Sequence, residues 1–235
     1  MPQFPDTELD GILARIGKTF ETGFEPLEVD GQRLEILQIA NMTSYLDRLA
    51  ASNAIQQPLR DLPLWAKVWP GSMILGRFLR KFSPQGKSLL ELGAGMGILA
   101  MIAARHGFAS IMATDISPQA VDFARANVLR NGLDNIVRTR ILDIASDSLP
   151  PDARFDIIAA SELLYLDELH RPILKFLGRH LAPDGKALFC TDLARQKPRF
   201  AKLAKDAFQI QEGGIGLKAS DGERHIYNIL ILEKK

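Results

Sequence analysis

The chain has 235 residues, of which 46% are hydrophobic, so it is long and apolar enough to bury the core of one α/β domain with a modest extension. Its net charge of +1 lacks the basic bias of a nucleic-acid binder, and no apolar run reaches the length of a membrane span. The single Cys190 excludes an intramolecular disulfide and a zinc–cysteine cluster, and the four histidines are not spaced as metal ligands. The chain start shows no signal-peptide pattern, so we expect a cytoplasmic protein that binds no metal, nucleic acid or membrane.

The first 63 residues predict an accessory layer ahead of a main domain, which we place at residues 64–235. Their position alone makes this layer a candidate for setting substrate specificity. In chain order we expect a helix from Leu9 to Ile16 capped by Thr7, a hairpin of residues 27–29 and 34–36 around Asp30-Gly31, a helix over residues 43–51 and a connection over residues 56–63.

Residues 87–117 predict half of a nucleotide-binding βαβ fold, and the rest of the chain is organised around them. Buried strands read as short apolar runs, and a helix reads as apolar residues at a period of 3.6. In chain order we expect a strand over residues 88–92, the turn Glu91-Leu-Gly93-Ala-Gly95-Met-Gly97, a helix over residues 98–106 ending at Gly107, and a strand over residues 110–114 ending in Asp115.

The spacing of the glycines indicates the kind of nucleotide. The third glycine of the dinucleotide fingerprint G-x-G-x-x-G is replaced by Ile98, and no phosphate-binding G-x-x-x-x-G-K-[S/T] is present. Asp115 lies about 20 residues past the turn, where a carboxylate can accept both hydroxyls of a ribose. An adenosine ligand without a pyrophosphate fits, and S-adenosylmethionine is one, with an ammonium that Glu91 can attract directly or through water. A turn whose glycines only permit close packing is the alternative, but it leaves both carboxylates unexplained.

The remaining sequence completes an α/β fold. Counting all strands predicts a Rossmann-like, seven-stranded, mostly parallel sheet with an antiparallel last strand, helices on both faces and a small N-terminal helix and hairpin extension. The last strand is antiparallel because the glycine-rich residues 213–222 offer no crossover helix. We expect helices over residues 72–82, 118–130, 169–181 and 198–208, a turn at residues 183–185, and strands over residues 136–142, 155–160, 186–191, 209–211 and 225–233.

Further cofactor-binding candidates lie near the strand ends, where open α/β sheets bind ligands. Ile116 follows Asp115 directly. Asp143 ends its strand where an acid can accept a hydrogen bond from the adenine amino group, although a turn residue is the alternative. Trp65 is expected to pin the accessory layer to the sheet, whereas for Trp69 a cofactor-facing role and a packing role are both open.

Acceptor-side candidates follow the strand over residues 155–160. Glu162 and Tyr165 there enter the mouth of the site beside the cofactor, and Ser161 before them is a candidate contact of the cofactor. Each has a structural alternative: Ser161 as a helix cap, Glu162 as an acid at a helix N-terminus, and Tyr165 as a core residue.

The turn E-x-G-x-G-x-G with an acid at the end of the next strand resembles motif I of the class I methyltransferases. The segment L-W-A-K-V-W-P-G before it and Glu162-x-x-Tyr165 after the fourth strand resemble the seven-strand protein-lysine methyltransferases, which include enzymes acting on chaperones and on the beta subunit of electron-transfer flavoprotein. Their signature is most often Asp-x-x-Tyr, so Glu162 is a longer variant. The N-terminal hairpin and W-P segment look closest to bacterial members. The resemblance covers roughly residues 64–235.

The resemblance implies methyl transfer to a lysine of a protein substrate. A lysine must be neutral to attack, yet its free pKa is about 10.4, so burial and a nearby sulfonium must depress it. A small-molecule N- or O-methyltransferase and a non-catalytic cofactor-binding partner protein stay open, with a dehydrogenase more distant. The implied catalytic residues are Glu162 and Tyr165, and those implied for S-adenosylmethionine are Trp69, Glu91, Gly93, Gly95, Gly97, Asp115, Ile116, Asp143 and Ser161.

Overall fold

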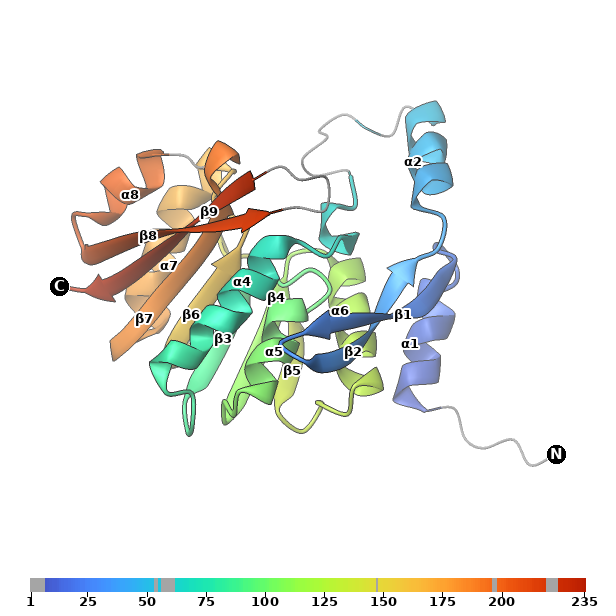
Figure 1. The fold of residues 1–235 in the computed structure, drawn as a ribbon, viewed down its shortest axis with the longest axis horizontal. Coiled ribbons are helices and arrows are strands. Elements are labelled where there is room, and N and C mark those ends of the chain that lie inside the picture. The colour runs from blue at the N-terminus through green and yellow to red at the C-terminus, as the bar shows by residue number, and fades with distance from the viewer. Residues whose placement is uncertain (1–6, 53–54, 56–61, 147, 196–197, 219–223) are drawn as a thin grey trace.

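The computed structural model describes residues 7–52, 55, 62–146, 148–195, 198–218 and 224–235. Within these residues a sheet of seven strands forms the centre of the molecule, in the order β5-β4-β3-β6-β7-β9-β8 (Figure 1). Neighbours from β5 to β7 are parallel, and β9 is antiparallel to β7 and β8. This confirms the predicted sheet. Its strands are β3 (Ser88–Leu92), β4 (Ser110–Asp115), β5 (Val137–Ile141), β6 (Phe155–Ser161), β7 (Leu181–Asp192), β8 (Phe208–Lys218) and β9 (Arg224–Lys234).

Helices cover both faces of the sheet, as predicted, and each face buries its own apolar cluster. Strand β3 serves both clusters because successive side chains of a strand point to opposite faces. Leu89 belongs to the first cluster, and Leu90 and Leu92 belong to the second. The first contains side chains of α4 (Pro70–Leu79), α5 (Ile98–Arg105) and α6 (Pro118–Arg130), and the second those of α7 (His170–His180) and α8 (Pro198–Ala204).

The first helix and the second hairpin strand pack beside α6, and the N-terminal elements contribute side chains to the first apolar cluster (Figure 1). Thr7 caps the first helix as predicted, because its Oγ1 accepts a hydrogen bond from the Asp10 N–H at 3.2 Å and its N–H donates to the Asp10 carboxylate at 3.0 Å. The boundary at residue 63 stays a prediction, and most of the expected connection, residues 56–61, lies outside the described residues. The elements are α1 (Glu8–Ile16), β1 (Thr22–Val29), β2 (Gln32–Ile39) and α2 (Met42–Ala51).

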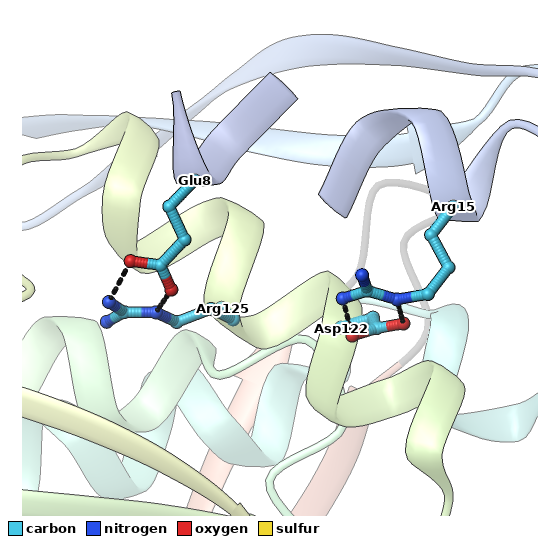
Figure 2. A network of polar contacts seen from close by, with 4 residues as sticks. All are labelled: Glu8, Arg15, Asp122 and Arg125. Carbon is cyan, nitrogen blue, oxygen red and sulfur yellow. Dashed lines mark hydrogen bonds and ion pairs between the residues drawn. The ribbon is translucent and has the colours of Figure 1, made fainter. Parts of the chain in front are cut away.

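Two bidentate ion pairs join α1 to α6 (Figure 2). Arg125 donates to both carboxylate oxygens of Glu8 at 2.6 and 2.8 Å, and Arg15 donates to both oxygens of Asp122 at 2.8 and 2.7 Å. The Glu8 and Arg15 side chains are each 56% exposed, so solvent screens both pairs and each contributes at most about 1 kcal/mol. Their fork geometry mainly sets the position of α1 on α6.

An aromatic cluster provides the stronger attachment of the N-terminal layer. The buried ring of Phe20 lies 5.0 Å from that of Tyr45, 5.8 Å from that of Trp65 and 5.7 Å from that of Phe123, measured between centroids. Trp65 and Phe123 are 4.9 Å apart in an edge-on arrangement. Trp65 therefore joins the layer to α6, whereas the sequence predicted that it would pin the layer to the sheet itself.

The C-terminal hairpin is longer than the sequence predicts. Strand β8 was expected over residues 209–211 with a connection over residues 213–222, but it continues through the glycines to Lys218. Antiparallel pairing with β9, from Phe208 opposite Lys234 to Lys218 opposite Arg224, supplies the hydrogen bonds that offset the poor strand propensity of glycine. The rest of the expected connection, residues 219–223, lies outside the described residues.

Other boundaries also differ, including those of the N-terminal hairpin, whose strands Thr22–Val29 and Gln32–Ile39 are longer than the predicted 27–29 and 34–36. The predicted turn at residues 183–185 lies inside β7 as an irregularity, because Phe155 pairs with Leu181 whereas Ile157 pairs with Lys186. The helix expected over residues 72–82 begins at Pro70, which suits a first helical position, and its last turn is a 3₁₀ helix, Arg80–Phe82. The last helix ends at Ala204, ahead of β8.

We predict that Phe20→Ala lowers the free energy of unfolding by about 3–5 kcal/mol, because it removes a buried ring shared by the layer and α6. The control Phe20→Leu keeps an apolar side chain and should cost less than about 1.5 kcal/mol. Urea unfolding of the three proteins measures both values. A loss below 1 kcal/mol for the alanine variant would contradict a closed aromatic cluster.

Candidate active site

The turn between β3 and α5 has left-handed backbone at three alternate residues. Gly93, Gly95 and Gly97 have φ values of 66°, 53° and 77°, which other side chains disfavour, so the glycines are required by the turn itself. The N–H of Ala94 donates to the Thr114 carbonyl at 2.8 Å, and the N–H of Gly97 donates to the Ala94 carbonyl at 2.8 Å. The turn is therefore tied to the end of β4.

Asp115, at the end of β4, holds the middle of this turn. Its Oδ2 accepts a hydrogen bond from the Gly95 N–H at 2.9 Å, and its Oδ1 accepts one from the Ser117 N–H at 2.9 Å. Burial raises the pKa of Asp115, although these backbone donors oppose the shift. Each oxygen has a second lone pair, so the carboxylate can still accept two ligand hydroxyls. Ile116 beside it is 66% exposed and offers an apolar face.

Glu91 lies under the turn and caps helix α5. The N-cap Gly97 has no side chain, and Glu91 Oε2 accepts a hydrogen bond from the N–H of Ala100 in the first helical turn at 2.9 Å. Burial, reinforced by the charge of Asp115, raises the pKa of Glu91 to about 8, although the Ala100 bond lowers it. A nearby cation would favour its charged form, and its contact with a cofactor ammonium stays a prediction.

Glu162 follows β6 in a strained conformation. Its φ of 53° is unusual for a residue with a long side chain, and such strain is retained mainly where the surroundings enforce it, often at active sites. Its N–H donates to the Cys190 carbonyl at 2.8 Å, and its Oε1 accepts from the Asp192 N–H at 3.1 Å. The side chain and backbone are thus both held by β7, and the residue is only 9% exposed.

The start of helix α4 lies directly against this carboxylate. A Cβ on Gly71 would be 2.6 Å from Ser161 Oγ, 3.4 Å from Glu162 Oε1 and 3.6 Å from Cys190 Sγ. The helix dipole favours a carboxylate at this end. Sequence reasoning missed Gly71 because its neighbours lie far along the chain. No local signal marked it, because the helix was predicted to begin at residue 72, whereas it begins at Pro70 and includes Gly71 in its first turn.

The hydroxyl of Tyr165 is influenced by the charges of the Asp115 and Glu162 carboxylates. Tyr165 is half-buried, and burial raises the pKa of its hydroxyl, with further increases from the charges of Asp115, Glu162 and Glu168. Its phenol stays protonated at neutral pH and can donate or accept a hydrogen bond. The structure thus brings the predicted acceptor pair, Glu162 and Tyr165, to the same end of the sheet as Asp115.

Trp69 and Asp143 have local contacts of their own. The Trp69 indole N–H donates to the Leu64 carbonyl at 2.9 Å, and its ring lies 4.7 Å from the Lys67 ammonium. Trp69 nevertheless caps α4 two residues before Gly71, so it borders the site. Asp143 Oδ1 accepts from the Ala145 N–H at 2.9 Å, which matches the turn alternative. The cofactor contacts of both residues stay predictions.

A cavity of about 450 Å³ lies at the opposite end of the strands from this site. It is lined by Asp30, Gln32, Arg80, Ser83, Pro84, Gln85, Arg105 and His106.

In the described part of the chain, no three acidic, histidine or cysteine side chains are grouped so that they could hold a metal ion. No helix among the described residues is both long and apolar enough to cross a membrane.

Comparison with known proteins agrees with this arrangement. Residues 73–214, more than half of the chain, match the family model described as ribosomal protein L11 methyltransferase (PrmA). The chain belongs to this methyltransferase family. Its sheet order and glycine turn are those of the class I S-adenosylmethionine-dependent methyltransferases, which confirms the resemblance inferred from motif I.

The relatives of this methyltransferase include enzymes named for protein substrates. It is 30% identical over 165 residues to protein N-lysine methyltransferase METTL21A of Danio rerio, covering 67% of this chain and 75% of that protein. It is 30% identical over 154 residues to the electron transfer flavoprotein beta subunit lysine methyltransferase of Mus musculus, covering 64% and 58%. It spans 44% of the ribosomal protein L11 methyltransferase of Symbiobacterium thermophilum and 36% of that of Thermotoga neapolitana, at 30% and 34% identity. The crystal structure of ribosomal protein L11 methylase from Lactobacillus delbrueckii subsp. bulgaricus superposes with a TM-score of 0.56 at 26% identity, covering 72% of this chain and 81% of that one.

Glu91 predicts that the stability of the methyltransferase depends on pH. Its pKa is about 8 when folded and 4.5 in a free side chain, so the folded state holds an extra proton between these values and stability falls as pH rises through them. Glu91→Gln removes the charge but keeps an acceptor for Ala100. We expect this variant to exceed wild type at pH 8.5 by up to about 5 kcal/mol and to match it near pH 4.5. Urea unfolding across this range measures the difference, and a gap independent of pH would contradict the assignment.

The close approach of Gly71 to Ser161 predicts that substitutions at these two residues have coupled effects on stability. Gly71→Ala should destabilise the methyltransferase by about 1–3 kcal/mol, because the new methyl group overlaps Ser161 Oγ. Adding Ser161→Ala removes that oxygen and should restore at least half of the loss. Thermal unfolding of the single and double variants measures the coupling. Strictly additive effects would mean that the two residues are not in contact.

Proposed function

We propose that the chain is a protein-lysine N-methyltransferase that uses S-adenosylmethionine. The observation that carries the proposal is Glu162, a nearly buried carboxylate on strained backbone, at the same end of the sheet as Tyr165 and the glycine turn. METTL21A of Danio rerio and the mouse flavoprotein enzyme are both named lysine methyltransferases, which supports lysine as the acceptor. A cytoplasmic location stays a prediction from the sequence.

The residues around the turn fit this cofactor. The carboxylate of Asp115 retains lone pairs for the ribose hydroxyls, and the exposed side chain of Ile116 beside it can cover one face of the adenine. Glu91 is a buried carboxyl whose charged form the ammonium would favour, and the backbone of Gly93 and Gly95 allows close approach. When bound there, S-adenosylmethionine supplies an electrophilic methyl group on a cationic sulfur.

The acceptor residues fit a lysine amine. The amine must lose its proton to water before it attacks. Burial in the site and the sulfonium charge lower the pKa of the amine, whereas the charge of Glu162 opposes this shift. Glu162 can accept a hydrogen bond from the amine and balances the positive charge of the methylated product. The protonated phenol of Tyr165 presents an oxygen that can align the amine. The chain contributes mainly position and exclusion of water.

The test is transfer of label from methyl-labelled S-adenosylmethionine to proteins of a host lysate, read by gel and mass spectrometry. We predict a labelled protein with a mass shift on lysine. Glu162→Gln should bind the cofactor with wild-type affinity by calorimetry but lose at least about 100-fold in transfer rate, since it removes the acceptor carboxylate. Asp115→Ala should lose cofactor binding itself.

The other outcomes separate the alternatives. Label confined to small molecules would replace the proposal with a small-molecule methyltransferase. Cofactor binding without label in any fraction would support a non-catalytic partner protein. Normal transfer by Glu162→Gln would show that Glu162 has no part in the mechanism. Whether lysine is the acceptor would still be decided by the position of the mass shift.

A further inference from the structure

We propose that Asn127 is a positioning residue that links the N-terminal hairpin to the cofactor turn. It lies on α6, is fully buried, and uses both ends of its side-chain amide. Its Oδ1 accepts a hydrogen bond from the Leu37 N–H of β2 at 2.7 Å, and its Nδ2 donates to the carbonyl of Met96 at 3.0 Å. Met96 is part of the glycine turn, so one buried amide bridges two segments that lie far apart in the sequence.

The hairpin depends on this side of α6 for its own hydrogen bonds. In the described residues β2 pairs with β1 alone, so its second edge has no neighbouring strand. The side chains of Asn127 and Asn131, four residues apart, accept hydrogen bonds from the Leu37 and Glu35 N–H groups along that edge. The spacing matches, because four helical residues rise about 6 Å and two strand residues about 7 Å. Asn131 accepts from the Glu35 N–H at 3.0 Å and donates to the Glu35 carbonyl at 2.8 Å.

On the other side, Asn127 completes the support of the turn. Thr114 holds the N–H of Ala94, Asp115 holds that of Gly95, and Asn127 holds the carbonyl of Met96. Only the Gly95–Met96 peptide lies between the Gly95 N–H and the Met96 carbonyl, so a shift of that carbonyl is passed through one peptide to the Gly95 N–H and its bond to Asp115. The N-terminal layer is therefore coupled to the hydrogen bond between Asp115 and the turn. The inference that this coupling affects cofactor binding rests on the proposed function, in which Asp115 binds the cofactor.

Asn131, which caps the C-terminus of α6, is a matched control, since it bonds the same strand without contacting the turn, and it also donates to the Asn127 backbone carbonyl at 2.7 Å. Asn127→Asp keeps an acceptor for Leu37 but places an oxygen against the Met96 carbonyl, whereas Asn131→Asp places an oxygen against the Glu35 and Asn127 carbonyls and leaves the bond to Met96 in place. We expect Asn127→Asp to weaken binding of S-adenosylhomocysteine about tenfold or more, to raise the KM for S-adenosylmethionine, and to leave kcat within about twofold. Asn131→Asp should leave all three within about twofold.

A readout on the unliganded protein separates this inference from the proposed function. Hydrogen exchange at residues 94–97 should be faster in Asn127→Asp, and in Asn127→Ala if the buried aspartate prevents folding, than in the corresponding Asn131 variants at equal global stability. If wild type binds no S-adenosylhomocysteine, the proposed function fails, yet this comparison still decides the role of Asn127.

A second measurement needs no variant. If wild type binds S-adenosylhomocysteine, exchange at the Leu37 amide should slow more than at the Glu35 amide, because the ligand steadies the turn and Asn127 transmits the effect. Equal exchange at residues 94–97 in both variant series, or an unchanged Leu37 amide in the complex, would overturn the inference.

Discussion

The structure depends on a single tight turn that leaves β3 and enters α5. Three left-handed residues reverse the chain there, and only glycine takes that conformation without strain. Glycines cannot supply side-chain caps, so other parts of the chain supply them. Glu91 caps α5 from below, and Asp115 binds the turn from the neighbouring strand. The residues expected to recognise the cofactor therefore also hold the turn in shape, which couples binding to local stability.

Helix α6 connects this turn to the rest of the molecule. It begins just after Asp115, receives α1 through two ion pairs and packs Phe123 into the aromatic cluster. It also carries Asn127 and ends at Asn131, and both side chains bond the edge of β2 that has no strand neighbour among the described residues. The N-terminal layer thus does more than cover a surface. Its Leu37 N–H bonds Asn127, which in turn bonds the Met96 carbonyl of the glycine turn, and this is the route by which we propose that the layer affects cofactor binding.

The acceptor side is built on a different principle. Glu162 occupies a conformation that costs free energy, and it is held there by β7 and by the start of α4. The absence of a side chain at Gly71 allows helix and carboxylate to approach closely. The site thus has a residue of low helix propensity at Gly71 and a strained backbone at Glu162. Such local costs, offset by tertiary contacts, are typical of residues retained for chemistry rather than for stability.

The sequence by itself determined the sheet, its seven strands, the glycine turn and the carboxylate at Asp115, because hydrophobic period and glycine spacing are local signals. It also placed Glu162 and Tyr165 at a strand end. Tertiary structure alone decided the rest. The long β8 exists because β9 pairs with it through its glycines, Gly71 matters because of side chains about 90 residues away, and Asn127 bridges two segments that no local pattern connects. In each case the deciding contact joins residues distant in sequence, which propensity and periodicity cannot register.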